Sequence, residues 1–189
     1  MGMLILKFFL VSGLVLHKAI WEILRTTSKE KPIEDRSIQL SAIKVVKIAI
    51  LLGVVVQIFL PDVFPISAEP FAIRVLGTVL YTGGLLTAIL ARFQLGNNWA
   101  NIETGQIVKD QQVVAKGIYG FIRHPIYTGD LLLLTGLELA LNSWLVLGVL
   151  LLAPVVMLKA IKEEEMLVAE LSGYDAYCAR TKRFIPFVI

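Results

Sequence analysis

Long apolar blocks alternate with short polar links along the chain. Five blocks are candidates for membrane-crossing helices, at about residues 1–24, 40–60, 71–93, 126–141 and 144–161. A transmembrane helix needs ~20 consecutive, mostly apolar residues. The pattern therefore predicts an all-α, polytopic integral membrane protein with about five transmembrane helices.

The last two blocks are separated only by the polar pair Asn142-Ser143. As one helix, the whole apolar run would reach roughly 54 Å at 1.5 Å per residue, whereas the hydrocarbon core of a bilayer is ~30 Å thick. We therefore expect a C-terminal helical hairpin over residues 126–161, whose two polar ends return to one membrane face. The hairpin would bring the turn at His124 close to the acidic run Glu163-Glu164-Glu165.

The distribution of Lys and Arg predicts the orientation. Basic residues occur in segments 25–39 and 94–123 and after residue 161, and they are missing from 61–70 and 142–143. Cytoplasmic loops carry an excess of Lys and Arg, so five spans would place all three basic segments in the cytosol. The N-terminal block has no cationic leader and no cleavage site, and we interpret it as a retained span. In a prokaryote the membrane would be the cell membrane.

Composition agrees with a membrane location. The chain has 189 residues, of which 57% are hydrophobic and 17% charged, which is too apolar for a soluble globule of this size. The net charge of +3 is better explained by topology and anionic lipid than by nucleic acid, which we do not expect as a partner. The single cysteine, Cys178, excludes an intrachain disulfide and a cysteine-based metal site, and no metal is expected.

Three smaller features complete the expected fold. Small residues in the third block, Gly83 and Gly84 among them, predict a close helix contact. Short apolar runs at 107–108 and 113–114 could be brief extended segments. After the hairpin, apolar residues at spacings near 3.6 predict an amphipathic helix from residue 162 to about 180.

Several polar residues are expected to gather at the cytosolic face. They are Tyr119, Arg123, His124, Tyr127, Lys159 and the run 163–165. Each alone has an ordinary explanation, because glutamates form solvated helix faces, lysines reach toward the interface and tyrosines belong to the aromatic belt. Together they would form a site, since tyrosine rings can stack on a flat base, carboxylates can balance a cation and a lysine can attract an anionic head group. Within the hairpin, Glu138 would face the protein interior, and Asp130 would be either interior or interfacial.

Several motifs between residues 95 and 186 occur together and in a specific order. They are Leu95-Gly96-Asn97-Asn98-Trp99, Gly117-Ile118-Tyr119, Arg123-His124-Pro125-Ile126-Tyr127, Glu163-Glu164-Glu165, Gly173-Tyr174 and Arg183-Phe184-Ile185-Pro186. With the apolar spacer between them, this half of the chain resembles the isoprenylcysteine carboxyl methyltransferase (ICMT) family, including its prokaryotic members. It is more distantly similar to the phospholipid methyltransferases. The first three apolar blocks resemble these families only in hydropathy.

The resemblance implies binding of S-adenosyl-L-methionine without a Rossmann domain. The cofactor contacts that it implies are Gln111, Gln112, Val113, Val114, Tyr119, His124, Pro125, Ile126, Tyr127 and Glu164. Lys159 or Lys162 stands near the place where the family has an arginine for the substrate carboxylate, and Lys159 is the candidate for this catalytic role. A lysine cannot form the bidentate contact of an arginine. Residues 94–189 would then be the catalytic region, preceded by three transmembrane helices in 1–93.

The implied reaction is methyl transfer to a lipid-like or lipidated small substrate that enters from the bilayer, with S-adenosyl-L-homocysteine as product. We expect O-methylation of an isoprenylcysteine-type carboxylate. A carboxylate is already ionised at neutral pH, so catalysis would rest on positioning and on the exclusion of water.

Three alternatives stay open from the sequence. A phospholipid or amine N-methyltransferase would need a base, for which Glu163, Glu165 or His124 could serve. An NADPH-dependent membrane reductase of the sterol type has motifs similar to 123–130 and to Tyr177-Cys178, although such proteins are longer. A non-enzymatic membrane scaffold would need no polar cluster at one face.

Overall fold

The computed structural model describes residues 2–27, 38–60, 62–98 and 111–188, and its regular elements are all helices. The α-helices are α1 (Gly2–Thr27), α2 (Ile38–Phe59), α3 (Phe71–Leu95), α4 (Pro125–Ala140), α5 (Val146–Glu170) and α6 (Tyr174–Arg180). Two short 3₁₀ helices, η1 (Gly96–Asn98) and η3 (Gly117–Gly120), lie in the connection after α3. No strand occurs in the described ranges, where only two isolated β-bridges form. The predicted all-α class is confirmed.

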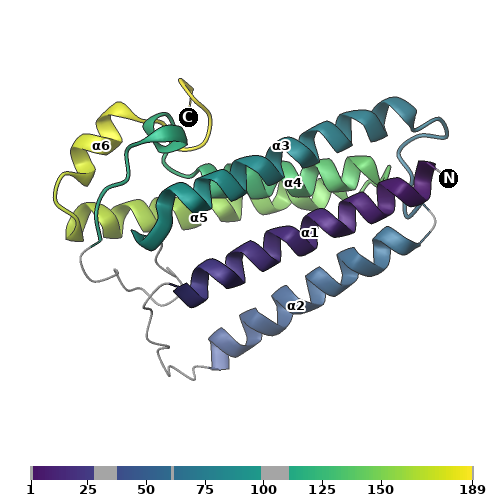
Figure 1. The fold of residues 1–189 in the computed structure, drawn as a ribbon, viewed down its shortest axis with the longest axis horizontal. Helices are drawn as coiled ribbons and strands as arrows, with labels where there is room; N and C mark the ends of the chain where they lie inside the picture. The colour runs from purple at the N-terminus through teal and green to yellow at the C-terminus, as the bar shows by residue number, and fades with distance from the viewer. Residues whose placement is uncertain (1, 28–37, 61, 99–110, 189) are drawn as a thin grey trace.

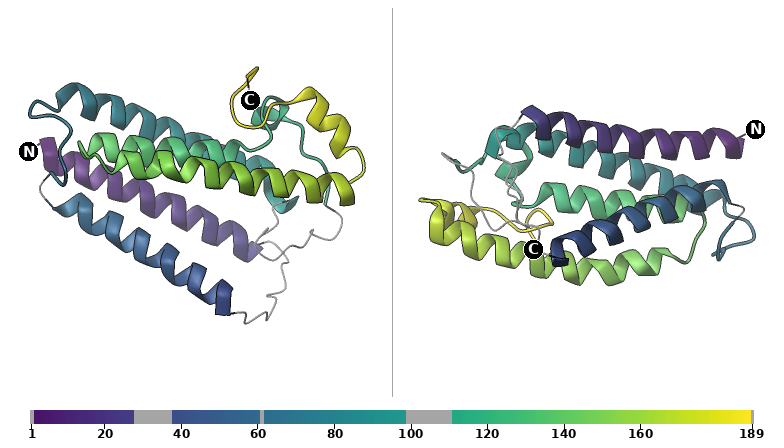
Figure 2. Two further views of the ribbon diagram at one scale, coloured as in Figure 1. Left: turned by 180° about the vertical axis from the view of Figure 1, so that it is seen from behind. Right: turned by 90° about the horizontal axis from the view of Figure 1, so that it is seen from below.

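The five long helices run lengthwise beside one another (Figures 1 and 2). The N-terminus, the turn 62–70 and the break 141–145 lie at one end of the bundle, while η3 and α6 lie toward the other. Helices α4 and α5 run in opposite directions, so the start of α4 and the end of α5 are neighbours in space. This arrangement brings the histidine turn and the glutamate run together.

Helices α3 and α4 are in backbone contact along a glycine seam made by Gly77, Gly84, Gly129 and Gly136. A Cβ atom added to Gly136 would lie 2.1 Å from the backbone nitrogen of Tyr81, and one added to Gly84 would lie 2.3 Å from that of Leu133. Small residues allow such close approach between helices in a membrane. The close contact predicted in the third block therefore exists at Gly84.

Gly83, by contrast, does not take part in the seam. A Cβ atom added there would meet no atom within 4 Å. Consecutive residues of an α-helix point about 100° apart, given 3.6 residues per turn. The sequence therefore could not distinguish which member of the pair faces α4.

Two polar pairs, one part-buried and one buried, tie the N-terminal helices to α4. His17 Nε2 of α1 lies 3.0 Å from Asp130 Oδ1, and Gln57 Nε2 of α2 donates to Glu138 Oε2 at 2.8 Å. Glu138 is buried, as predicted, and Asp130 is half-buried. Because unpaired polar groups are costly in an apolar interior, each pair satisfies groups that neither helix could satisfy alone.

The predicted helix boundaries after the hairpin are wrong. Helix α5 continues without interruption to Glu170, so the glutamate run belongs to it and no separate helix begins at residue 162. Glu, Met, Leu and Ala are strong helix formers, and they extend the helix into the polar region. The break between α5 and α6 covers residues 171–173, and Gly173, with a left-handed φ of 83°, caps the start of α6.

Of the two short apolar runs in the connection after α3, the structure describes only the one at 113–114. Val113 and Val114 lie in irregular backbone, and no strand forms there. Residues 107–108, Trp99 and most of the basic segment 25–39 lie outside the described residues.

Two of the described helices are long and apolar enough to cross a membrane by length and composition: the part of α1 over Gly2–Leu24 and all of α3. A shorter apolar helix covers Ile48–Phe59. Helix α4 has only 16 residues, fewer than the ~20 that a span usually needs. The count of five spans therefore stays a prediction.

Candidate functional site

The turn before α4 is held in place by the C-terminal segment. Pro125 occupies the first turn of α4, where its missing N–H costs nothing. Arg123 N donates to Lys182 O at 2.8 Å, His124 N donates to Arg183 O at 3.0 Å, and Lys182 N donates back to Phe121 O at 3.1 Å. These bonds fix the backbone from which the side chains of Arg123 and His124 extend.

Glu164 accepts hydrogen bonds from three basic side chains. Arg123 Nε donates to Oε1 at 2.8 Å, Arg183 Nη2 donates to Oε2 at 2.7 Å, and His124 Nε2 lies 2.9 Å from Oε1. Burial alone would raise the pKa of Glu164, but the bonds from His124, Arg183 and Arg123 outweigh it and hold that pKa well below its usual range. Glu164 is therefore ionised and can only accept, which requires His124 Nε2 to carry a hydrogen.

Glu163 has a different environment, although it is the next residue. Its Oε2 accepts a hydrogen bond from the Tyr127 hydroxyl at 2.9 Å and lies 3.7 Å from His124 Nδ1. Burial raises the pKa of Glu163 above its ordinary value, against the opposing influence of His124, Tyr127 and Lys159. Residues 163 and 164 are beyond the predicted span 144–161, at the polar end of α5.

Tyr127 joins these groups into one cluster. Its ring stacks on the His124 imidazole, with ring centres 5.4 Å apart and an interplanar angle of 5°. Lys159 Nζ lies 5.5 Å from the centre of the Tyr127 ring, within the range of a cation–π contact. Thus Lys159, Tyr127 and Glu163 form one row along the α4–α5 contact.

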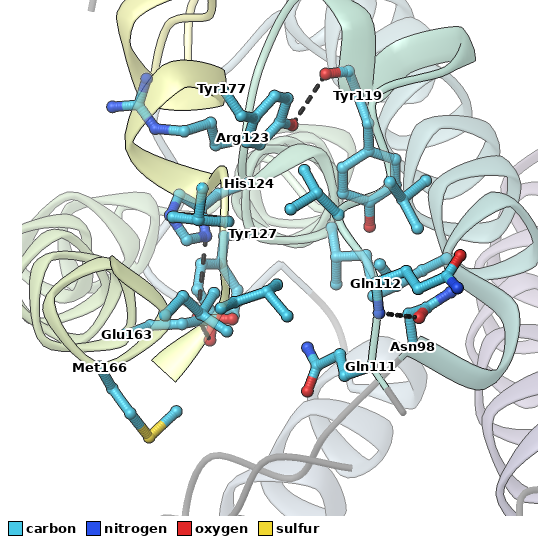
Figure 3. A pocket seen from close by; sticks show the side chains of 17 residues that line it. Asn98, Gln111, Gln112, Tyr119, Arg123, His124, Tyr127, Glu163, Met166 and Tyr177 are labelled. Carbon is cyan, nitrogen blue, oxygen red and sulfur yellow. Dashed lines mark hydrogen bonds and ion pairs between the residues drawn. The ribbon is translucent and has the colours of Figure 1, made fainter. Parts of the chain in front are cut away.

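A pocket lies beside this cluster, between the end of α5, the first turn of α4, α6 and the segment after residue 110 (Figure 3). It encloses about 770 Å³, including its open mouth. Its lining residues are Leu95, Asn98, Gln111, Gln112, Val113, Val114, Tyr119, Arg123, His124, Ile126, Tyr127, Glu163, Met166, Leu167, Leu171, Tyr174 and Tyr177. Figure 3 shows Glu163 and Met166 on one side of the pocket, with Gln111 and Gln112 on the other.

The structure brings together most of the cofactor contacts expected from the sequence. Eight of the ten line the pocket: Gln111, Gln112, Val113, Val114, Tyr119, His124, Ile126 and Tyr127. Pro125 is buried at the start of α4, and Glu164 is buried among its basic partners, so neither forms part of the wall. Lys159 lies outside the wall as well and reaches the cluster through the Tyr127 ring.

Other lining residues were missed by sequence reasoning. Tyr174 and Tyr177 of α6 close one side, and the Tyr177 hydroxyl donates to Tyr119 O at 2.8 Å. Burial raises the pKa of Tyr177 to about 12, so its hydroxyl keeps the proton that this bond needs. The signal was available, because Tyr174 and Tyr177 are tyrosines three apart beside Gly173. Within the described residues, no group of His, Cys, Asp and Glu is arranged to hold a metal ion.

The helical fold and this pocket define a class of protein: a bundle of long helices with a pocket at one end. A family model described as phospholipid methyltransferase matches residues 72–173, which is more than half of the chain. The chain belongs to the phospholipid methyltransferase family, and the resemblance to membrane methyltransferases predicted from the sequence is confirmed.

Among solved structures, the chain is similar to that of the eukaryotic intramembrane Ras methyltransferase ICMT (isoprenylcysteine carboxyl methyltransferase). The TM-score is 0.49 and the sequence identity 21%, over 92% of this chain. The chain spans 63% of the length of that protein chain. Comparison with curated protein sequences gives no match.

Proposed function

We propose that the protein transfers a methyl group from S-adenosyl-L-methionine to a lipid-like or lipidated small substrate that enters from the bilayer. The observation that carries this proposal is the pocket, whose wall contains eight of the ten side chains expected to contact the cofactor. These residues come from the segment at 111–119 and from the start of α4, and side chains of α5 such as Glu163 and Met166, which are far away in the sequence, complete the wall. Their convergence on one cavity supports a single small-molecule site.

The lining residues fit this cofactor in chemical kind. Tyr119, Tyr174 and Tyr177 offer flat aromatic surface to a purine ring. The carboxylate of Glu163 suits a sulfonium cation and the ammonium group of an amino acid.

The cofactor, when bound, supplies an electrophilic methyl group. The contribution of the chain is to position the two reactants and to exclude water from the site. His124 and Tyr127 are fixed by their contacts to the glutamates, while Ile126 and Leu167 provide apolar wall. A strong negative charge beside the sulfonium would stabilise the cationic ground state more than the transition state, in which the positive charge is being lost. The hydrogen bond from the Tyr127 hydroxyl partly neutralises the negative charge of the Glu163 carboxylate.

For the acceptor, an isoprenylcysteine-type carboxylate is one candidate. It is ionised at neutral pH and needs no base. Lys159, on the α5 side of the cluster, would attract such an anion toward the site. As a lysine it would act by charge and not by a bidentate contact.

An amine, as in a phospholipid head group, is the second candidate, and Glu163 favours it. An ammonium group must lose a proton before it can attack a methyl group, so the reaction needs a base. Glu163 is the carboxylate that lines the pocket, and it is half-buried beside Tyr127. The same carboxylate would repel an anionic acceptor.

We also propose that five helices span the membrane and that the pocket opens to the cytosol. The basic residues beside the pocket support this orientation, because Lys and Arg are enriched on the cytoplasmic side. In a prokaryotic cell the membrane would be the cell membrane.

The proposal is tested by calorimetric titration of the detergent-solubilised protein with S-adenosylhomocysteine. We expect saturable binding that Glu163→Gln and Glu164→Ala weaken, while Glu165→Gln, at the exposed neighbour, binds like the wild type. Saturable binding of NADPH in its place would overturn the proposal in favour of a reductase. Folded protein that binds neither ligand would overturn it in favour of a scaffold.

The acceptor is identified in a second step. The protein is incubated with methyl-labelled cofactor and with lipid fractions that carry either free carboxylates or free amines. Label in the amine fraction supports N-methylation, and label in the carboxylate fraction supports O-methylation. Label in neither fraction contradicts both candidates.

A further inference from the structure

The C-terminal segment contributes a charged side chain to the cluster at Glu164. Arg183 Nε lies 3.0 Å from Oε1 and 3.1 Å from Oε2 of Glu164, and its Nη2 lies 2.7 Å from Oε2. Residue 183 lies beyond the matched family region, which ends at residue 173. The segment that carries Arg183 is nevertheless bonded to the turn before α4 through its backbone.

This ion pair differs from an ordinary surface pair. The side chains of Glu164 and Arg123 are each 9% exposed, and that of Arg183 is 28% exposed. Exposed ion pairs contribute little because water screens them, whereas removal of one partner from a buried group leaves a charge uncompensated. Loss of Arg183 would therefore remove one of the three basic side chains that compensate the Glu164 carboxylate.

Both arginines contact both oxygens of Glu164, but not equally. Oε1 faces His124 Nε2, Arg123 Nε and Arg183 Nε, at 2.9 Å, 2.8 Å and 3.0 Å. Oε2 is held closely by Arg183, through Nη2 at 2.7 Å and Nε at 3.1 Å, and more loosely by Arg123 Nη2, at 3.3 Å. Without Arg183, Oε2 keeps only the long contact, and the carboxylate is free to rotate toward Arg123 and away from the imidazole.

The orientation of Glu164 decides which nitrogen of His124 carries the hydrogen. With Oε1 on Nε2, that nitrogen carries a hydrogen, and in a ring with a single hydrogen Nδ1 then presents a lone pair on the side of Glu163. A carboxylate that holds one ring nitrogen fixes both the tautomer and the ring orientation of a histidine.

We infer that Arg183 is a positioning residue of the site, which sets the tautomer and orientation of His124 through Glu164. The C-terminal segment 181–184 is then part of the functional site, although it contributes no side chain to the wall of the pocket. The expected effect on binding rests on the proposed function, whereas the tautomer itself does not.

Histidine NMR tests the inference directly, because the chain has only two histidines, His17 and His124. In ¹⁵N-histidine-labelled protein in lipid nanodiscs, a His17→Gln variant assigns the two imidazoles. We expect one Nε2–H tautomer for His124 in the wild type and a mixture of tautomers in Arg183→Gln. The signals of His17 should not change, and they report that the variant is folded.

Arg180→Gln is the matched control, since Arg180 is exposed and its Nε donates to the carbonyl of Ala176. Arg183→Lys keeps the charge but loses the second donor, and it should lie between the wild type and Arg183→Gln. It also serves as the test if Arg183→Gln does not fold. We expect affinity for S-adenosylhomocysteine to fall ~10-fold in Arg183→Gln, as for loss of a hydrogen bond to a charged group, and to stay unchanged in Arg180→Gln.

An unchanged His124 tautomer in folded Arg183→Gln, or in Arg183→Lys where that variant replaces it, would overturn the inference. Wild-type protein that binds no S-adenosylhomocysteine would contradict the proposed function, and a His124 tautomer that still changes in Arg183→Gln would leave the positioning role of Arg183 supported. The two failures are therefore distinguishable.

Discussion

Glu163 and Glu164 lie against opposite nitrogens of one imidazole. Glu164 Oε1 is 2.9 Å from His124 Nε2, and Glu163 Oε2 is 3.7 Å from His124 Nδ1. Consecutive helical residues point about 100° apart, so a ring placed between the two directions can reach both. The charge of Glu164 is neutralised by arginines, and of these two glutamates it is Glu163 that presents its carboxylate to the pocket.

This difference predicts a substrate-dependent effect of Glu163→Gln. With an amine acceptor, kcat should fall about 10²- to 10⁴-fold, the usual contribution of a general base. With a carboxylate acceptor, kcat should change by less than about tenfold, because no proton has to be removed. Steady-state rates with both acceptors check the prediction. Equal losses with the two acceptors would show that Glu163 is not a base.

Lys159→Ala should affect the acceptor and not the cofactor. Its ammonium group lies over Tyr127 and outside the wall of the pocket, so binding of S-adenosylhomocysteine should be unchanged. The KM of an anionic acceptor should rise about fivefold to tenfold, as for loss of ~1 kcal/mol of partly screened attraction. Lys162→Ala, at an exposed position one turn along α5, is the control. A parallel rise in KM for Lys162→Ala would assign the effect to general surface charge.

The neighbours Gly83 and Gly84 predict opposite effects of the same substitution. Gly84→Ala should destabilise the protein by about 3 kcal/mol or more, because its Cβ atom would lie 2.3 Å from the backbone of α4. Gly83→Ala should be neutral or stabilise by about 0.4–1 kcal/mol, since its Cβ atom meets no other atom and alanine favours the helix. Thermal unfolding in detergent measures both. Similar midpoints for the two variants would contradict the glycine seam.

The buried ion pairs of Glu164 predict an acid limit of stability. Burial raises the pKa of Glu164, but the bonds from His124, Arg183 and Arg123 lower it by a larger amount. The pKa of Glu164 in the folded protein is therefore below its unfolded value of about 4.3. A lowered folded pKa stabilises the protein above the unfolded pKa, and this contribution is lost as the pH falls toward the folded value. The melting temperature of the wild type should therefore exceed that of Glu164→Gln at pH 7, and the difference should shrink below about pH 5. A difference that is independent of pH would show that the ionised carboxylate is not the cause.

The sequence was sufficient where hydropathy and spacing determine structure. The apolar blocks became α1 to α5, and the break at Asn142 let α4 and α5 run back along each other, which placed His124 beside Glu164. The features that the sequence did not predict depend on the rotation of a helix about its axis and on contacts between distant segments. Nothing in an acidic run says which glutamate faces a pocket, and nothing near residue 183 says that it bonds residue 164.

The glycine seam has a consequence for how such a site can diversify. Because the backbones of α3 and α4 touch, a larger side chain at a seam glycine has almost no room. The helix whose start carries His124 and Tyr127 therefore tolerates little change at this contact. Helix α5 faces the opposite situation: Val155 and Leu158 are 58% and 61% exposed, although Ala160 and Glu164 further along are buried. Substitutions on the outer flank of α5 therefore meet far weaker packing constraints than substitutions at the contact between α3 and α4, on which the histidine turn depends.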